Sequence, residues 1–165
     1  MARRVFYSFH FNADAWRTGQ VRNIGTVEAN KPVTDNEWET IKKGGDAAIR
    51  QWIDGQFYGK SCAIVLIGAA TAGRKWIKYE IEKAWNDGKG LLGIYVHNLK
   101  DHAGNKTTKG RNPFEDFTLN NGKTKLSSVV ETYDPPYTAS TSVYAYIAVN
   151  LAAWVEAAIA IRDNH

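Results

Sequence analysis

Short apolar runs alternate with amphipathic segments along most of the chain. Residues 62–67 read CAIVLI and residues 91–96 read LLGIYV, and neither run alternates with polar side chains. Strands buried on both faces of a parallel sheet have this pattern, and both runs are too short for typical helices. Residues 5–9 predict a first strand, and a weaker extended segment at 24–27 predicts a second.

Segments with a helical period separate these strands. Thr34 and Glu37 have the spacing of a capping box, which predicts a short helix through Ile41. Asp46 is placed to cap a second helix that ends near Phe57.

The remaining helical segments differ in their expected length. Asn12 or Asp14 can cap a single short turn at 15–18, and Gly19 would end it. The two long helices are expected from the turn at 68–73 to residues 86–88, and from 142 to 162.

Strands alternating with helices predict an α/β fold with a central parallel sheet. No repeat or linker divides the chain, so residues 1–165 are expected to form one domain. The stretch 97–125 is polar and long for a connection in a compact domain, so we expect it to be either functional or mobile. A short strand near 128–132 should follow it.

The composition says more about the cellular compartment of the protein than about its function. The net charge of +4 and the pI of about 9.1 suit an anionic small molecule, but the charges are scattered and nucleic-acid binding ranks last. Cys62, the single cysteine, lies in an apolar run and fits a reducing compartment. Neither a signal peptide nor an apolar stretch of about 20 residues is evident. We therefore expect a cytoplasmic protein with no membrane contact.

Glu80 is the strongest candidate for chemistry. It follows Trp76 by four residues, so both side chains share one face of the helix after the turn at 68–73. Open α/β sheets bind ligands beyond the carboxyl ends of their strands, where this helix begins. A lone carboxylate in a partly apolar pocket can stabilise an oxocarbenium cation or orient a sugar hydroxyl. A two-carboxylate glycoside hydrolase is not predicted, and Glu82, on another face, is a natural control.

Polar residues near the first two strands are weaker candidates. Ser8, Phe9 and His10 end the first strand, at the sheet edge where the Glu80 helix starts. Phe9 could stack on a base or a nicotinamide ring, and His10 could contact phosphate or ribose. Ser8 lacks an ordered base beside it and is not predicted to be a nucleophile. Arg22 and Asn23 could bind an anionic group, although a solvated loop is the plainer interpretation.

Other common sites find no support in the sequence. The histidines and Cys62 lack ligand spacing, so no metal is expected. Without a GxGxxG or P-loop motif, no Rossmann-type cofactor is expected. The five tryptophans other than Trp76 have helical spacing and are predicted to be core residues: Trp16, Trp38, Trp52, Trp85 and Trp154.

Several of these segments together resemble a known family. They are RVFYSFH near the N-terminus, VRN at 21–23, VLIG at 65–68, WIKYEI at 76–81 and GRNPF at 110–114. The combination resembles TIR domains, and more specifically the TIR-like ThsB proteins of the bacterial Thoeris anti-phage system.

The resemblance implies a flavodoxin-like, three-layer fold and NAD+ as the substrate rather than a bound cofactor. It implies cleavage of the bond between nicotinamide and ribose by the glutamate of a W-x-x-x-E segment, which matches Glu80, with Trp76 as its tryptophan. Ser8, Phe9, His10 and Asn23 would bind the substrate. The product would be an ADP-ribose-derived signal, typically a cyclic ADP-ribose isomer, that activates a downstream effector. Catalysis by TIR enzymes often requires self-assembly, which the resemblance also implies here.

The match is incomplete, and alternatives stay open. Many TIR sequences have Ser-x-Trp-Cys before the glutamate, whereas Arg74 and Ile77 occupy those places here, and Phe9 stands where Tyr is common. Hydrolase, cyclase and transferase would all use Glu80. A non-catalytic TIR adaptor and a nucleoside deoxyribosyltransferase-like enzyme are the competing functions.

Overall fold

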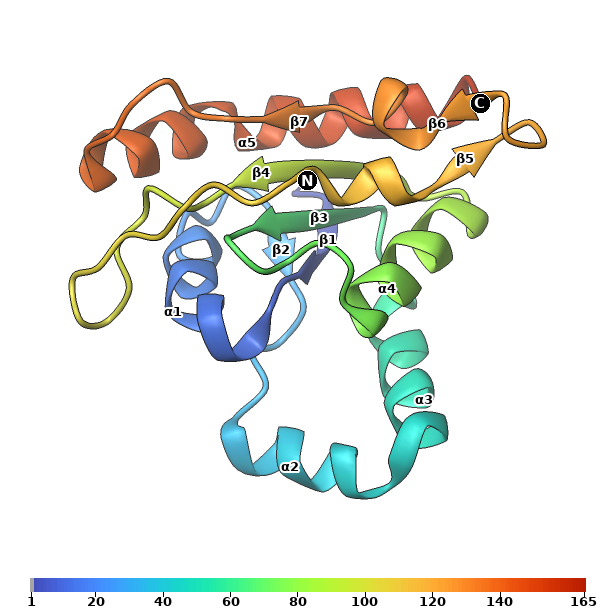
Figure 1. The fold of residues 1–165 in the computed structure, drawn as a ribbon, viewed down its shortest axis with the longest axis horizontal. Helices are drawn as coiled ribbons and strands as arrows, with labels where there is room; N and C mark the ends of the chain where they lie inside the picture. Colours follow the sequence, from blue (N-terminus) through green and yellow to red (C-terminus); the bar gives the residue numbers. More distant parts are fainter. Residues whose placement is uncertain (1) are drawn as a thin grey trace.

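A central parallel sheet organises the computed structural model, which describes residues 2–165 (Figure 1). Its strands lie in the order β2-β1-β3-β4-β7, and each neighbouring pair is parallel. The strands are β1 (Arg4–Ser8), β2 (Glu28–Ala29), β3 (Cys62–Ile67), β4 (Gly90–Tyr95) and β7 (Thr132–Tyr133). Every residue of β3 and β4 is buried, as their unbroken apolar runs predict.

Helices cover both faces of the sheet. They are α1 (Phe11–Arg22), α2 (Asp35–Lys43), α3 (Gly45–Phe57), α4 (Lys75–Asn86) and α5 (Ser140–Asp163). Successive strand residues point to opposite faces, so one apolar cluster joins the sheet to α1 and α5 and a second joins it to α3 and α4. The predicted α/β fold with three layers and a central parallel sheet is confirmed.

The first helix differs most from its prediction. Instead of a short turn, α1 runs for 12 residues and passes through Gly19. His10, not Asn12 or Asp14, is the N-cap, and its Nδ1 accepts the N–H of Ala13 at 3.0 Å. The inward face of α1 is largely polar, with an ion pair between Asp14 and Arg17. Because hydrophobic periodicity is weak there, the sequence pattern could not reveal the helix.

Smaller differences concern element boundaries. The capping box of α2 is present as predicted, but α3 begins at Gly45 with no side-chain cap, and Asp46 pairs with Lys75 instead. Gly45 has a φ of 79°, a conformation that favours glycine and lets α3 follow α2 directly. The second strand lies at 28–29 rather than 24–27, and the last strand at 132–133 rather than 128–132.

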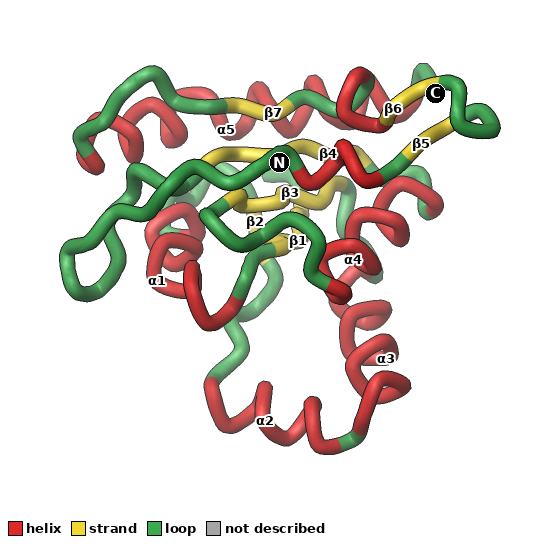
Figure 2. The backbone as a smooth tube through the Cα atoms, viewed as in Figure 1, coloured by secondary structure: helices red, strands yellow, loops and turns green. Residues whose placement is uncertain are grey.

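The segment after β4 is anchored to the body at several points. Figure 2 shows it leaving the sheet as a long loop before two short strands. It contains the 3-10 helices Pro113–Asp116 and Leu126–Ser128, and a hairpin of β5 (Thr118–Leu119) with β6 (Thr124–Lys125). Phe114 and Leu126 are buried in the same apolar cluster as α4.

The C-terminal helix corrects one expectation about membranes. By length and composition alone, α5 is apolar enough to cross a bilayer, although no such stretch was expected from the sequence. One face of α5 packs into the apolar cluster on the sheet through residues that include Ile147, Leu151 and Val155. A long core helix passes the same test, so this is weak evidence for a membrane span.

Candidate functional site

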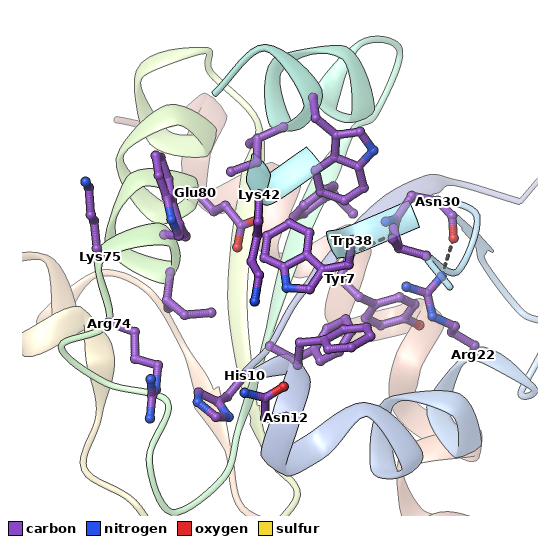
Figure 3. Close-up of a pocket in the computed structure, with 18 residues that line it drawn as sticks. Tyr7, His10, Asn12, Arg22, Asn30, Trp38, Lys42, Arg74, Lys75 and Glu80 are labelled. Atoms are coloured by element: carbon purple, nitrogen blue, oxygen red, sulfur yellow. Dashed lines mark hydrogen bonds between the residues drawn. The ribbon is translucent and has the colours of Figure 1, made fainter. Parts of the chain in front are cut away.

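A pocket of about 360 Å³ opens beyond the carboxyl end of β1. This volume lies within the range of small-molecule sites, which is about 300–1,000 Å³. Its walls come from the end of β1, both ends of α1, the segment after β2, and helices α2, α3 and α4 (Figure 3). The helix pair α2–α3 lies below the sheet in Figure 1 and gives the pocket its outer wall.

Glu80 is the one carboxylate among the described residues that line this pocket. Its side chain is buried, and it receives a hydrogen bond of 2.7 Å from the hydroxyl of Ser8 to Oε1. Burial raises the pKa of Glu80 to about 8, and the Ser8 hydrogen bond opposes part of that shift. Such a perturbed carboxyl in a cleft marks a candidate catalytic group.

Ser8 takes a different position from the one predicted. It is buried at the end of β1, behind Glu80, and is not among the residues that line the pocket. Its contact is with the carboxylate, so the structure associates it with Glu80 rather than with a ligand.

Phe9, His10 and Trp76, which were predicted to bind the substrate, all line the pocket. Because Nδ1 of His10 accepts the Ala13 N–H, the neutral ring carries its proton on Nε2. Burial and then the nearby charge of Arg74 lower the pKa of His10, which favours that neutral form. His10 therefore offers the pocket a hydrogen-bond donor.

Asn23 lies outside the pocket. It is the exposed C-cap of α1, and its backbone N–H is bonded to the carbonyl oxygens of Gly19 and Val21. The neighbouring Arg22 lines the pocket instead, together with Asn30 from the segment after β2. A residue-by-residue match to VRN could not show which side chain faces inward, since helix α1 was not predicted to extend that far.

Aromatic side chains that were assigned to the core also face the pocket. Trp38 and Trp52 line it, and their ring centroids are 6.0 Å apart. Phe11, at the start of α1, lies 6.2 Å from Trp38. Apolar spacing on α2 and α3 does not distinguish a face that meets the core from one that meets a cavity. Trp16, also predicted to be core, is 57% exposed on α1.

Four cationic side chains complete the lining: Arg22, Lys42, Arg74 and Lys75. Together with the aromatic rings, they suit a ligand that carries both a flat ring and an anionic group. Between residues 2 and 165, no group of three or more His, Cys, Asp or Glu side chains is arranged to hold a metal ion. The pocket therefore combines aromatic rings, cationic side chains and one buried carboxyl, a combination that suits a nucleotide.

Two comparisons with known proteins found matches to this chain. A protein of Bacillus cereus (strain MSX-D12), named "Putative cyclic ADP-D-ribose synthase ThsB1", is 38% identical over 120 residues. The match covers 70% of this chain but 62% of that relative, less than two thirds of its length. The family model for the TIR-like domain of the Thoeris protein ThsB matches residues 6–101, which is more than half of the chain and includes Ser8, Trp76 and Glu80. The chain belongs to the Thoeris ThsB TIR-like family.

Proposed function

We propose that this protein cleaves NAD+, releases nicotinamide and converts the ADP-ribosyl group into a signal, a cyclic ADP-ribose isomer. The observation that carries the proposal is the buried carboxyl of Glu80 in a pocket otherwise lined by aromatic and cationic side chains. The name of the relative from Bacillus cereus gives independent support. That the signal acts on a downstream effector, and that the enzyme self-assembles in the cytoplasm, are further parts of the same proposal.

In the proposed reaction, the bond between the nicotinamide nitrogen and the ribose carbon breaks. The bonding electron pair leaves with nicotinamide, which becomes neutral, and the ribose becomes an oxocarbenium cation. The Glu80 carboxylate stabilises that cation from a buried position where charge interactions are strong. The positive nicotinamide ring of the substrate favours the ionised form of Glu80 before the bond breaks.

Capture of the cation then decides the product. Attack by a ring nitrogen of the substrate's own adenine gives a cyclic isomer, whereas attack by water gives linear ADP-ribose. Folding the substrate back on itself requires surfaces for two rings, and Phe9, Phe11, Trp38, Trp52 and Trp76 supply them around one pocket. The same surfaces displace water from the cation.

The test is mass spectrometry of NAD+ after incubation with wild type, with Glu80→Gln and with Glu82→Gln. Glu82 is an exposed residue of the same helix outside the pocket lining, so it controls for loss of a helix carboxylate. We expect nicotinamide release to fall at least about 100-fold in Glu80→Gln and to be unchanged in Glu82→Gln. The assay should include concentrated protein and lysate of phage-infected cells. Equal product from wild type and Glu80→Gln would rule the mechanism out.

Parallel incubations with deoxynucleosides separate this function from deoxyribosyl transfer. The pocket's cations favour a substrate that bears phosphate, which free deoxynucleosides lack. We therefore expect no base exchange. Base exchange without NAD+ cleavage would favour the transferase, and no turnover of either substrate in any condition would favour a non-catalytic adaptor.

A further inference from the structure

Arg22 is a cation in the pocket wall whose charge is not balanced by the protein. It is the last residue of α1, is half-buried, and forms no ion pair with any described side chain. Its Nη1 donates to the backbone oxygen of Asn30, and its guanidinium carbon lies 5.6 Å from the centre of the Tyr7 ring. Burial lowers the pKa of Arg22, which reflects the cost of keeping this charge away from water.

Tyr7, next to Arg22, carries a second polar group that has no partner in the described part of the protein. Tyr7 lines the pocket, and its hydroxyl is buried with no hydrogen-bond partner among the described residues. Its backbone N–H donates to the side-chain oxygen of Asn30 at 3.1 Å, so Tyr7, Asn30 and Arg22 form one connected wall. A buried hydroxyl without a partner is rare in native proteins and calls for a ligand or ordered solvent.

The other pocket cations are already compensated or open to solvent. Lys75 pairs with Asp46, and Lys42 lies 3.2 Å from Glu39. Arg74 is exposed, and its Nε donates to the backbone oxygen of Ala70 at 2.9 Å. Arg22 is therefore the pocket cation for which an anionic ligand would relieve the largest desolvation cost.

Arg22 also lies at a suitable place relative to Glu80. In Figure 3, Arg22 and Asn30 occupy one side of the pocket and Glu80 the other, with Tyr7 and Trp38 between them. A nucleotide whose sugar contacts Glu80 would extend its phosphates away from that carboxylate. A guanidinium matches phosphate oxygens in a two-pronged geometry that a lysine cannot reproduce.

We propose that Arg22, with the Tyr7 hydroxyl beside it, binds the diphosphate of the nucleotide substrate. The identity of that substrate as NAD+ rests on the function proposed above, whereas the diphosphate site itself does not. Arg22 is a binding residue that fixes the substrate's phosphates, so its main effect is on affinity rather than on the cleavage step.

Isothermal titration with ADP and with adenosine tests the site without any catalysis. Arg22→Gln should weaken ADP binding about 10- to 100-fold, the loss of one or two charge-assisted hydrogen bonds, and leave adenosine binding nearly unchanged. Arg22→Lys should fall between, and Tyr7→Phe should weaken ADP binding by less than Arg22→Gln. Arg50→Gln is the control, because Arg50 is an exposed arginine of α3 outside the pocket lining.

Two results of the binding experiment would overturn this assignment. One is wild-type protein that binds ADP no more tightly than adenosine. The other is an Arg22→Lys variant, folded by circular dichroism, that loses both ligands equally, since that would indicate a structural role. ADP binding that depends on Arg22 in a protein unable to cleave NAD+ would support the diphosphate site and refute the proposed reaction. NAD+ cleavage with an unchanged KM in Arg22→Gln would support the proposed reaction and refute the diphosphate site.

Discussion

Glu80 and Ser8 form a unit in which two effects act on one carboxyl in opposite directions. Burial raises the pKa of Glu80, and the hydroxyl of Ser8 lowers it by donating to the charged form. Burial dominates, so the pKa is about 8 and much of the free protein carries a protonated Glu80 at neutral pH. Since the proposed mechanism requires the carboxylate, activity should rise with pH through this value.

We therefore predict that kcat/KM for NAD+ increases with pH to a plateau, with a midpoint near 8 in wild type. In Ser8→Ala the carboxylate loses its donor, so the midpoint should move to higher pH. A shift of one unit would lower the rate at pH 7 about tenfold. Ser8→Thr retains a hydroxyl and should retain the wild-type midpoint. A pH profile of Ser8→Ala that coincides with wild type would show that the hydrogen bond does not tune Glu80.

Helices and strands differed in how far the sequence could predict them. Buried strands such as β3 were clear because both faces are apolar, and the capping box placed α2. Helix α1 was not clear, because its inner face holds the charged residues Asp14 and Arg17. Their burial depends on their mutual pairing and on hydrogen bonds from Arg17 to the distant loop after β4, which the sequence pattern does not show. That Glu80 and Trp76 lie on the same side of α4, where both line the pocket, could be predicted from their spacing of four residues. The outer pocket wall was not, since it depends on how α2 and α3 pack.

The wall that α2 contributes to the pocket can be tested through its capping box. The Thr34 hydroxyl accepts the N–H of Glu37, and the Glu37 carboxylate accepts the N–H of Thr34, both at 3.2 Å. None of the described side chains of α2 is fully buried, although Trp38 and Ile41 pack against the apolar cluster of α3 and α4. We therefore expect the cap to matter for the local stability of this helix. Thr34→Ala should destabilise α2 by about 1 kcal/mol.

Because Trp38 and Lys42 of α2 line the pocket, we expect Thr34→Ala to raise the KM for NAD+ several-fold while the melting temperature of the whole protein changes little. Faster amide hydrogen exchange, confined to α2, is the direct measurement. Thr40→Ala removes the same atoms from the middle of this helix and should not accelerate exchange. Equal exchange rates in Thr34→Ala and wild type would contradict the role of the cap.

A buried ion pair between Arg17 and Asp14 connects the segments that lie beyond the carboxyl ends of the strands, next to the site. Arg17 donates to Asp14 at 2.8 Å, to the backbone oxygen of Leu99 at 2.7 Å and to that of Asn105 at 2.8 Å. Asp14 also packs against the turn after β3, where a Cβ added to Gly68 would lie 2.2 Å from its Oδ2. These contacts join α1, the β3–α4 turn and the long loop after β4, three segments far apart in the sequence.

Removing one partner of this pair should destabilise the whole molecule. Arg17→Met leaves the fully buried Asp14 without its cation and should reduce the free energy of unfolding by about 3–5 kcal/mol. Burial already raises the pKa of Asp14, and Arg17 opposes that shift. Without Arg17, the Asp14 carboxyl therefore holds its proton more tightly in the folded variant than in the unfolded chain. The variant must then lose stability relative to wild type as the pH rises above the carboxyl's unfolded pKa. Urea unfolding at pH 4 and pH 7 measures this difference, and adding Asp14→Asn should restore stability mainly at pH 7. An equal loss at both pH values would mean that Arg17 acts through packing and backbone contacts rather than through its charge.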